Sequence, residues 1–370
     1  NSFSHFLVSQ YRDASVLIPG NLANDELTFQ IKKQFNLGLD FSALGNRFNF
    51  SVNYFDNKNE NVVILELQNS YLGYDTYPNN TASFSTKGIE TEAFGRVISR
   101  SDFSLDLGLN FSKYSTIIDQ ITTGQQILDV PGQMQIINRE GEPVNSFYGY
   151  RFKGVYASSQ EAEDANMYNF RRLPYRAGDA IYENIADASG KLDNVIDKND
   201  KQLLGSFEPD FYGGFIINTR YKNLSLNMFF QGVYGNEVYN YMRQQNENMT
   251  GLENQSVKTL QRWQYEGQQT SVPKATWGDP MGNAVFSDRW IEDGSYLRLK
   301  NLTLSYDVTR IMLGLSSLKV FVTASNLFTL TKYLGYDPEF SYSQDMVKQG
   351  VDYANMPVSK QFMLGVKIGL

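Results

Sequence analysis

Residues 103–111 read Phe-Ser-Leu-Asp-Leu-Gly-Leu-Asn-Phe, with an apolar side chain at every second position. Successive side chains of a β-strand point to opposite faces, so this stretch predicts a strand with one apolar and one polar face. The same alternation runs through residues 35–41, 48–54 and 362–370. The chain is therefore predicted to be all-β.

We predict ten strands, several of them longer than the five or six residues usual in globular sheets. They cover residues 2–12, 27–41, 46–57, 86–99, 102–116, 211–220, 222–234, 295–307, 318–330 and 360–370. The apolar residues stand at odd positions up to Leu299 and at even positions from Leu302 onward, which predicts a β-bulge near Lys300 and Asn301. A tilted strand of about 9–11 residues crosses a membrane, so these lengths favour an antiparallel transmembrane β-barrel.

The connections between the predicted strands alternate in length. The short ones are 42–45, 100–101, 221 and 308–317, and the long ones are 13–26, 58–85, 117–210, 235–294 and 331–359. Outer-membrane barrels have short periplasmic turns and longer extracellular loops, which predicts that the long loops lie outside the cell. The competing interpretation is a soluble two-sheet protein with one buried face per strand. Loops this long are unusual in compact soluble domains and argue against it.

The composition excludes several classes of function. The 370 residues contain no Cys and one His, so a Cys-ligated metal site and a His-rich site are both excluded. A net charge of -7 is a poor fit to a nucleic-acid-binding protein, which needs a basic face. The sequence also has no phosphate-binding loop, dinucleotide fingerprint or nucleophile elbow, so no enzymatic activity is predicted.

One acidic loop is a candidate cation site. Its aspartates are Asp187, Asp193, Asp197 and Asp200. Calcium takes six to eight oxygen ligands, and closely spaced carboxylates can supply them. The match is imperfect because Asn194 stands where a glycine is expected. The alternative is a solvated surface turn, and no other metal or cofactor is predicted.

Several runs beside the long loops resemble one known family. They are Ser-Asp-Arg-Trp-Ile-Glu-Asp-Gly-Ser-Tyr-Leu-Arg-Leu-Lys-Asn-Leu-Thr-Leu at 287–304, Asn-Leu-Phe-Thr at 326–329, Gly-Tyr-Asp-Pro-Glu at 335–339, Glu-Pro-Val with Phe-Tyr-Gly-Tyr within 142–150, and Asn-Leu-Gly-Leu-Asp at 36–40. Together and in this order they resemble the SusC family of TonB-dependent outer-membrane transporters of Bacteroidetes.

The resemblance implies a 22-stranded barrel around an N-terminal plug. Residues 1–370 would then be the C-terminal portion of that barrel, about ten strands, with the plug and the TonB box absent from this sequence. One departure is the final residue, because the family usually ends in an aromatic and this chain ends in Leu370.

The resemblance also implies a function, which is active import of oligosaccharides or peptides across the outer membrane. The expected partners are a SusD-like surface lipoprotein, TonB acting through the plug, and the lipid bilayer. The chain would be a multi-pass protein of the cell outer membrane. Two alternatives stay open on the residues alone: a complete ten-stranded outer-membrane barrel enzyme and a passive porin.

Overall fold

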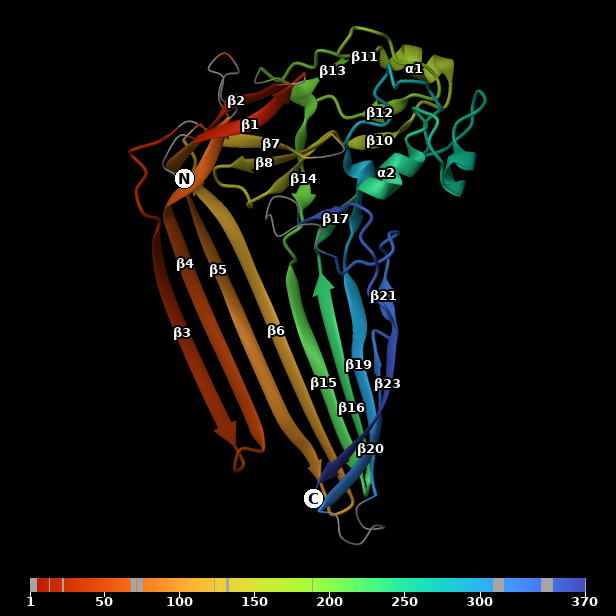
Figure 1. The fold of residues 1–370 in the computed structure, drawn as a ribbon. Coiled ribbons are helices and arrows are strands. Elements are labelled where there is room, and N and C mark those ends of the chain that lie inside the picture. Colours follow the sequence, from red (N-terminus) through yellow and green to blue (C-terminus); the bar gives the residue numbers. More distant parts are fainter. Residues whose placement is uncertain are drawn as a thin grey trace.

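A computed structural model describes residues 5–12, 14–21, 23–67, 71, 76–122, 124–130, 133–187, 189–308, 316–340 and 349–369. Its main feature is a tall antiparallel sheet of ten strands with a body of folded loops at one end (Figure 1). The path across the sheet is β23 (Gln361–Gly369), β20 (Ser317–Ser325), β19 (Tyr296–Asp307), β16 (Leu224–Tyr234), β15 (Phe211–Tyr221), β6 (Phe103–Gln120), β5 (Thr76–Ser99), β4 (Phe48–Leu67) and β3 (Ile31–Ala43), and β21 (Thr329–Thr331) pairs with β19.

The register of the strands builds one continuous apolar face, called the apolar face below. Residues paired across neighbouring strands point to the same side, so a row of pairs can be followed through the sheet. One row runs Phe41, Phe50, Ala93, Leu109, Phe215, Phe230 and Leu299. Another pairs Leu304 with Val322 and Val322 with Leu364.

Large side chains of the apolar face are exposed. Leu39 is 62% exposed and Leu364 is 73% exposed. A soluble sheet protein would pack such a face against a second layer, because large exposed apolar patches are rare on soluble proteins. The soluble two-sheet alternative is therefore wrong, and the expected transmembrane barrel wall is confirmed.

The opposite face is polar and is called the polar face below. Its corresponding row runs Asp40, Ser51, Glu92, Asn110, Gly214, Gln231 and Arg298. Asp106 lies on this face and forms an ion pair of 2.8 Å with Arg96. Leu107, its neighbour in the chain, pairs with Ile217 on the apolar face. The alternation in residues 103–111 thus correctly predicts which side chains of β6 lie on the apolar face and which lie on the polar face.

The short and long connections lie at opposite ends of the sheet, as predicted. The turns after β3, β5 and β15 lie at the end that carries the C-terminus, and the long connections lie at the other end (Figure 1). The β3–β4 turn is tight, with Leu44, Gly45 and Asn46 all in the left-handed region. Residues 309–315 and Leu370 fall outside the described residues.

The predicted bulge in β19 is confirmed. Asn301 pairs with Phe229 and Leu299 pairs with Phe230, which leaves Lys300 as the extra residue. The Lys300 carbonyl accepts the backbone N–H of Asn326 at 2.9 Å. Asn326 is itself left-handed, with φ of 55°, so the predicted strand 318–330 is interrupted there and resumes as β21.

Two predicted elements differ from the structure. Over the residues that the structure describes, the first strand, β1 (His5–Tyr11), pairs only with β2 (Ala14–Asn21), in a hairpin separate from the wall. The predicted loop 58–85 is largely strand, because β4 and β5 stay paired as far as Leu67 and Thr76. Alternating side chains predict a strand but do not say which strand it pairs with. Beyond the end of the apolar face, β4 and β5 remain paired by backbone hydrogen bonds although their residues no longer alternate, so the sequence pattern does not show this part of the strands.

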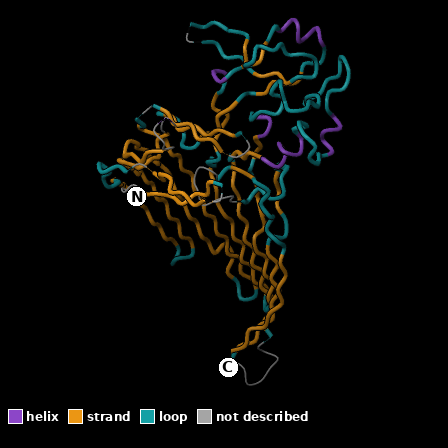
Figure 2. Tube along the Cα trace, turned by 45° about the horizontal axis from the view of Figure 1, so that its top comes forward, coloured by secondary structure: helices purple, strands orange, loops and turns teal. Residues whose placement is uncertain are grey.

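The long connections fold into a packed assembly of their own, called the outer body: the described residues of 124–210, 235–294 and 331–352. Helices and loops crowd this end in Figure 2. It contains a four-stranded sheet of β14 (Gln202–Ser206), β9 (Ser146–Gly149), β8 (Met134–Arg139) and β7 (Gln125–Val130), and a three-stranded one of β18 (Ile291–Asp293), β17 (Glu237–Asn240) and β22 (Val351–Asp352).

Smaller elements complete the outer body. They are the pair β10 (Phe152–Val155) and β12 (Ala180–Tyr182), the pair β11 (Tyr168–Asn169) and β13 (Val195–Ile196), the helices α1 (Ser159–Ala165) and α2 (Tyr241–Glu247), and the 3-10 turns Lys198–Asp200, Val257–Gln261 and Asp288–Trp290. None of the described helices is long and apolar enough to cross a lipid bilayer.

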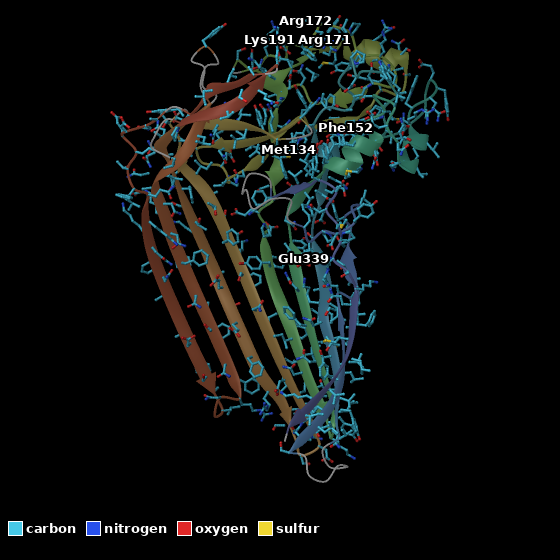
Figure 3. The ribbon with its side chains drawn as sticks, viewed as in Figure 1. Met134, Phe152, Arg171, Arg172, Lys191 and Glu339 are labelled. Atoms are coloured by element: carbon cyan, nitrogen blue, oxygen red, sulfur yellow. The ribbon has the colours of Figure 1, made fainter. Side chains whose placement is uncertain are left out.

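Trypsin added to intact cells is expected to cleave the outer body and spare the opposite turns. Arg171, Arg172 and Lys191 are exposed at its far end (Figure 3). Arg47 lies in the β3–β4 turn, which outer-membrane topology places in the periplasm. Mass spectrometry of the released peptides measures the result, and trypsin added to lysed cells is the control. Cleavage after Arg47 with protection of Arg171 in intact cells would reverse the orientation.

Candidate functional site

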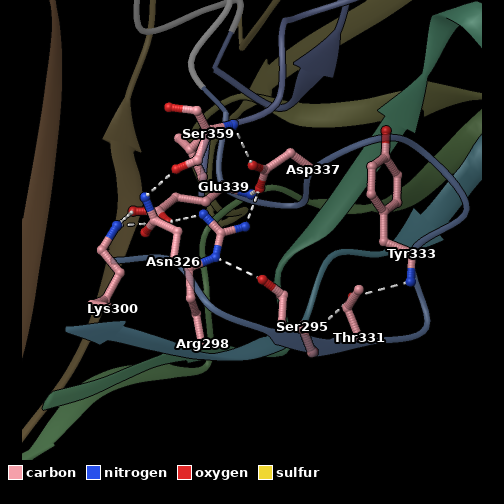
Figure 4. A network of polar contacts seen from close by, with 11 residues as sticks. Ser295, Arg298, Lys300, Asn326, Thr331, Tyr333, Asp337, Glu339 and Ser359 are labelled. Atoms are coloured by element: carbon pink, nitrogen blue, oxygen red, sulfur yellow. Dashed lines mark hydrogen bonds and ion pairs between the residues drawn. The ribbon is translucent and has the colours of Figure 1, made fainter. Parts of the chain in front are cut away.

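The base of the outer body is fastened to the wall by a buried ion-pair network (Figure 4). Arg298 stands on the polar face of β19 and is 2% exposed. Its guanidinium donates to Thr329 at 2.8 Å, to Glu339 at 2.6 Å and to Asp337. Lys300, the bulge residue, reaches the same Glu339 carboxylate at 2.8 Å.

Asp337 also accepts hydrogen bonds from the backbone of two neighbouring segments. Its carboxylate accepts the backbone N–H of Glu339 and that of Val358, each at 2.9 Å. A carboxylate that accepts backbone donors and a guanidinium together fixes both partners in one geometry. Residues 335–339 therefore form a turn in which the carboxylates of Asp337 and Glu339 both point toward Arg298.

A second polar cluster joins two connections of the outer body, 235–294 and 331–352. Glu292 accepts from Arg243 at 2.9 Å and from the backbone N–H of Leu334 at 2.9 Å. The Tyr333 hydroxyl donates to Asp352 at 2.5 Å, and burial is the main cause that raises the pKa of Tyr333. Residues far apart in the chain, on α2, β18, β22 and the 332–334 turn, are thus linked in one network.

The residues just before β19 contribute to a hydrophobic cluster in the outer body. Trp290 is fully buried in a cluster that includes Met134, Phe147 and Tyr239, and its indole N–H donates to the Val285 carbonyl at 3.0 Å. Arg289 lies 4.2 Å from the Trp290 ring centre, and burial lowers its pKa to about 10. These contacts pack the residues just before β19 into the hydrophobic core of the outer body.

A polar pocket opens where the polar face meets the outer body. Its volume is about 440 Å³ and its lining includes Tyr114, Glu208, Asp210 and Glu237. Burial raises the pKa of both Glu208 and Glu237. Sequence reasoning missed these carboxylates, because they are isolated in the sequence and only the fold brings them together.

The four aspartates of the candidate calcium loop each accept a backbone N–H, and Asp200 accepts one from Asp197 in its own turn and a second from a residue 15 positions earlier. Asp187 accepts the backbone N–H of Ser189 at 2.8 Å, and Asp200, which is buried, accepts that of Ile185 at 2.7 Å. Asp193 and Asp197 accept from the residues two places later. Over the described part of the chain, no group of three or more acidic or histidine side chains is arranged to hold a metal ion. A calcium site stays a prediction.

Comparisons with known proteins identify relatives along nearly the whole chain. No protein-family model matches it. The TonB-dependent receptor P3 of Formosa agariphila is 31% identical over 94% of this chain, and TonB-dependent receptor SusC of Bacteroides thetaiotaomicron is 24% identical over 93%. The matches cover 35% and 32% of those relatives, so the chain spans about a third of their length.

A solved structure shows the same fold. The solved structure of the RagAB peptide transporter superposes with a TM-score of 0.80 at 25% identity, and the match covers all of this chain and 38% of that one. Proteins similar to this chain in both comparisons thus carry the names of receptors and a transporter.

Proposed function

Since this chain is a member of the SusC-like family of TonB-dependent receptors, we propose that it forms the C-terminal part of an outer-membrane barrel that imports nutrients actively. The continuous apolar face carries this proposal. It stays exposed over nine strands and is backed by a polar face, which is what a wall between hydrocarbon and a water-filled lumen requires.

We propose that the cargo is an oligosaccharide or a peptide, bound between the polar face and the outer body. The pocket beside Glu237 lies at that junction and offers carboxylates and a tyrosine hydroxyl, groups that hydrogen-bond to either cargo. The structural relative RagAB is a peptide transporter, which favours a peptide as the cargo. Energy would come from TonB acting on a plug, and a SusD-like lipoprotein would cover the outer body.

The open sheet argues against a complete ten-stranded barrel, whether an enzyme or a porin. At its edges, β3 pairs only with β4, and β23 pairs only with β20, over the residues that the structure describes. Closure into a barrel removes both edges, so these strands need further partners. A larger barrel satisfies that need.

Uptake by intact cells tests the proposal. Cells that carry the full-length gene should take up fluorescent peptides or oligosaccharides, and deleting either the gene or tonB should abolish uptake of one of these cargoes. Restoring the wild-type gene is the control. Uptake that survives the loss of tonB and reappears with the purified protein in liposomes would show a passive porin instead.

Purification of the full-length protein from native membranes tests the partner. A tagged chain should retain a surface lipoprotein through gentle detergent extraction, which mass spectrometry would identify. Recovery of the barrel alone, with uptake intact in cells, would remove the lipoprotein from the proposal and leave transport standing.

A further inference from the structure

A hollow of about 350 Å³ lies on the polar face, over the strands β3, β4 and β5. Phe55 of β4 belongs to its lining and pairs with Asn36 on β3 and with Gly88 on β5. The Phe55 ring covers Gly88, because any side chain at that glycine would collide with the ring. One aromatic ring is therefore held against the wall on the side that faces away from the lipid.

Primary amides surround this ring. Asn53 and Asn57 lie two residues before and after Phe55 on β4, so their side chains point to the same face. Gln34 pairs with Asn57, and Asn36 stands two residues further along β3. Among these four amides, the hydrogen bond from Gln34 to Asn36 at 3.3 Å is the one that the described part of the chain forms. The remaining N–H groups and carbonyl oxygens can bind a ligand.

The hollow continues across the wall to the pocket beside Glu237. Gly88 pairs with Tyr114 of β6, and Tyr114 lines that pocket. Tyr212 of β15 follows, with its ring centre 6.2 Å from that of Tyr114, and is 38% exposed. Neighbouring strands lie about 4.8 Å apart, so β3 and β6 are separated by about 14 Å. The four amides and the rings of Phe55, Tyr114 and Tyr212 are called the lumen track below.

The charges beside the lumen track are negative. Glu90 lines the hollow, and Asp40 and Glu92 lie on the same face, where all three are exposed. The ion pairs that the described residues of β3, β4 and β5 form involve other side chains. Like charges repel, so these carboxylates disfavour an anionic ligand. They accept hydrogen bonds from the hydroxyl groups of a neutral one.

We propose that the lumen track binds a neutral oligosaccharide, with one sugar ring on Phe55 and further rings toward Tyr114. A sugar ring carries C–H groups on its face and hydroxyls around its edge, and each hydroxyl both donates and accepts a hydrogen bond. An extended peptide offers one N–H and one C=O per residue, which would leave most of the amides around Phe55 unmatched. The inference rests on the proposed import function and selects one of its two cargoes, whereas the structural relative is a peptide transporter.

Calorimetric titration of the full-length protein in detergent, with neutral hexasaccharides of glucose, xylose and mannose, tests the proposal. Phe55→Ala should weaken the binding of whichever hexasaccharide the wild type binds by roughly tenfold, which corresponds to about 1.4 kcal/mol. A galacturonic acid hexasaccharide, which is anionic, should bind more weakly by a similar factor. Phe321→Ala is the matched control, because Phe321 lies on the polar face over the cross-strand glycine Gly365 but on β20, outside the lumen track. It should bind as the wild type does.

A second variant keeps the test valid if Phe55→Ala fails to fold. Asn36→Ala removes one exposed amide and no packed ring, and should also weaken hexasaccharide binding. Equal binding by the wild type and all folded variants would overturn the proposal, as would binding of none of the neutral hexasaccharides. If cells then still import peptides in a TonB-dependent manner, the import function stands without the lumen track. A lower unfolding midpoint for Phe55→Ala than for Phe321→Ala, with binding unchanged, would instead make the lumen track a contact with another part of the full-length chain.

Discussion

Replacing Arg298 with alanine is expected to destabilise the folded chain by about 3–5 kcal/mol, because it leaves Asp337 and Glu339 without their buried partner. The effect should be seen in the full-length protein as a lower midpoint of denaturant unfolding, followed by tryptophan fluorescence. Trp290 lies in the outer body that the network secures, so its signal reports on the affected region.

Three further variants separate the effect of the ion-pair network from a general loss of side-chain volume. Arg298→Met combined with Asp337→Asn removes opposite charges together and should recover part of the loss seen in Arg298→Met alone. Arg220→Ala removes an exposed arginine of β15 and should change stability by less than about 0.5 kcal/mol. Equal losses for Arg298→Ala and Arg220→Ala would show that the network contributes little.

Placing arginine at Leu107 is expected to cost about 2–4 kcal/mol, because this position is the middle of the five outward residues from Phe103 to Phe111 and would put a charge in hydrocarbon. The fraction of full-length protein that folds into lipid vesicles, read as the heat-modifiable band on a gel, measures the effect across a denaturant series.

Asn110→Arg is the matched control for this substitution. Asn110 is exposed on the polar face of the same strand and is paired with Glu92, so an arginine there meets water and a carboxylate. It should fold as the wild type does. If the two arginine variants lose stability equally, the assignment of the apolar face to lipid is wrong.

The candidate sites show where sequence reasoning stops. The run 287–304 is recognisable from its resemblance to a family, yet nothing in its letters says that Arg298 contacts Asp337, which lies 39 residues later. The Glu208 and Glu237 carboxylates have no local pattern at all. In the acidic loop, closely spaced aspartates predict a shared cation, which stays a prediction, and the structure shows that each of the four carboxylates accepts a backbone N–H of the loop.

The sequence by itself determined the nine long strands of the wall, the direction in which their side chains face, and the end of the sheet at which each connection lies. Period-two alternation depends only on the geometry of the extended backbone, so it can be read locally, as it was for residues 103–111 and for the bulge at Lys300. The tertiary structure alone decided that β1 pairs outside the wall, that β4 and β5 extend past the apolar band, and that the long connections pack around Trp290. Those outcomes depend on contacts between distant segments, whose free energy no local pattern records.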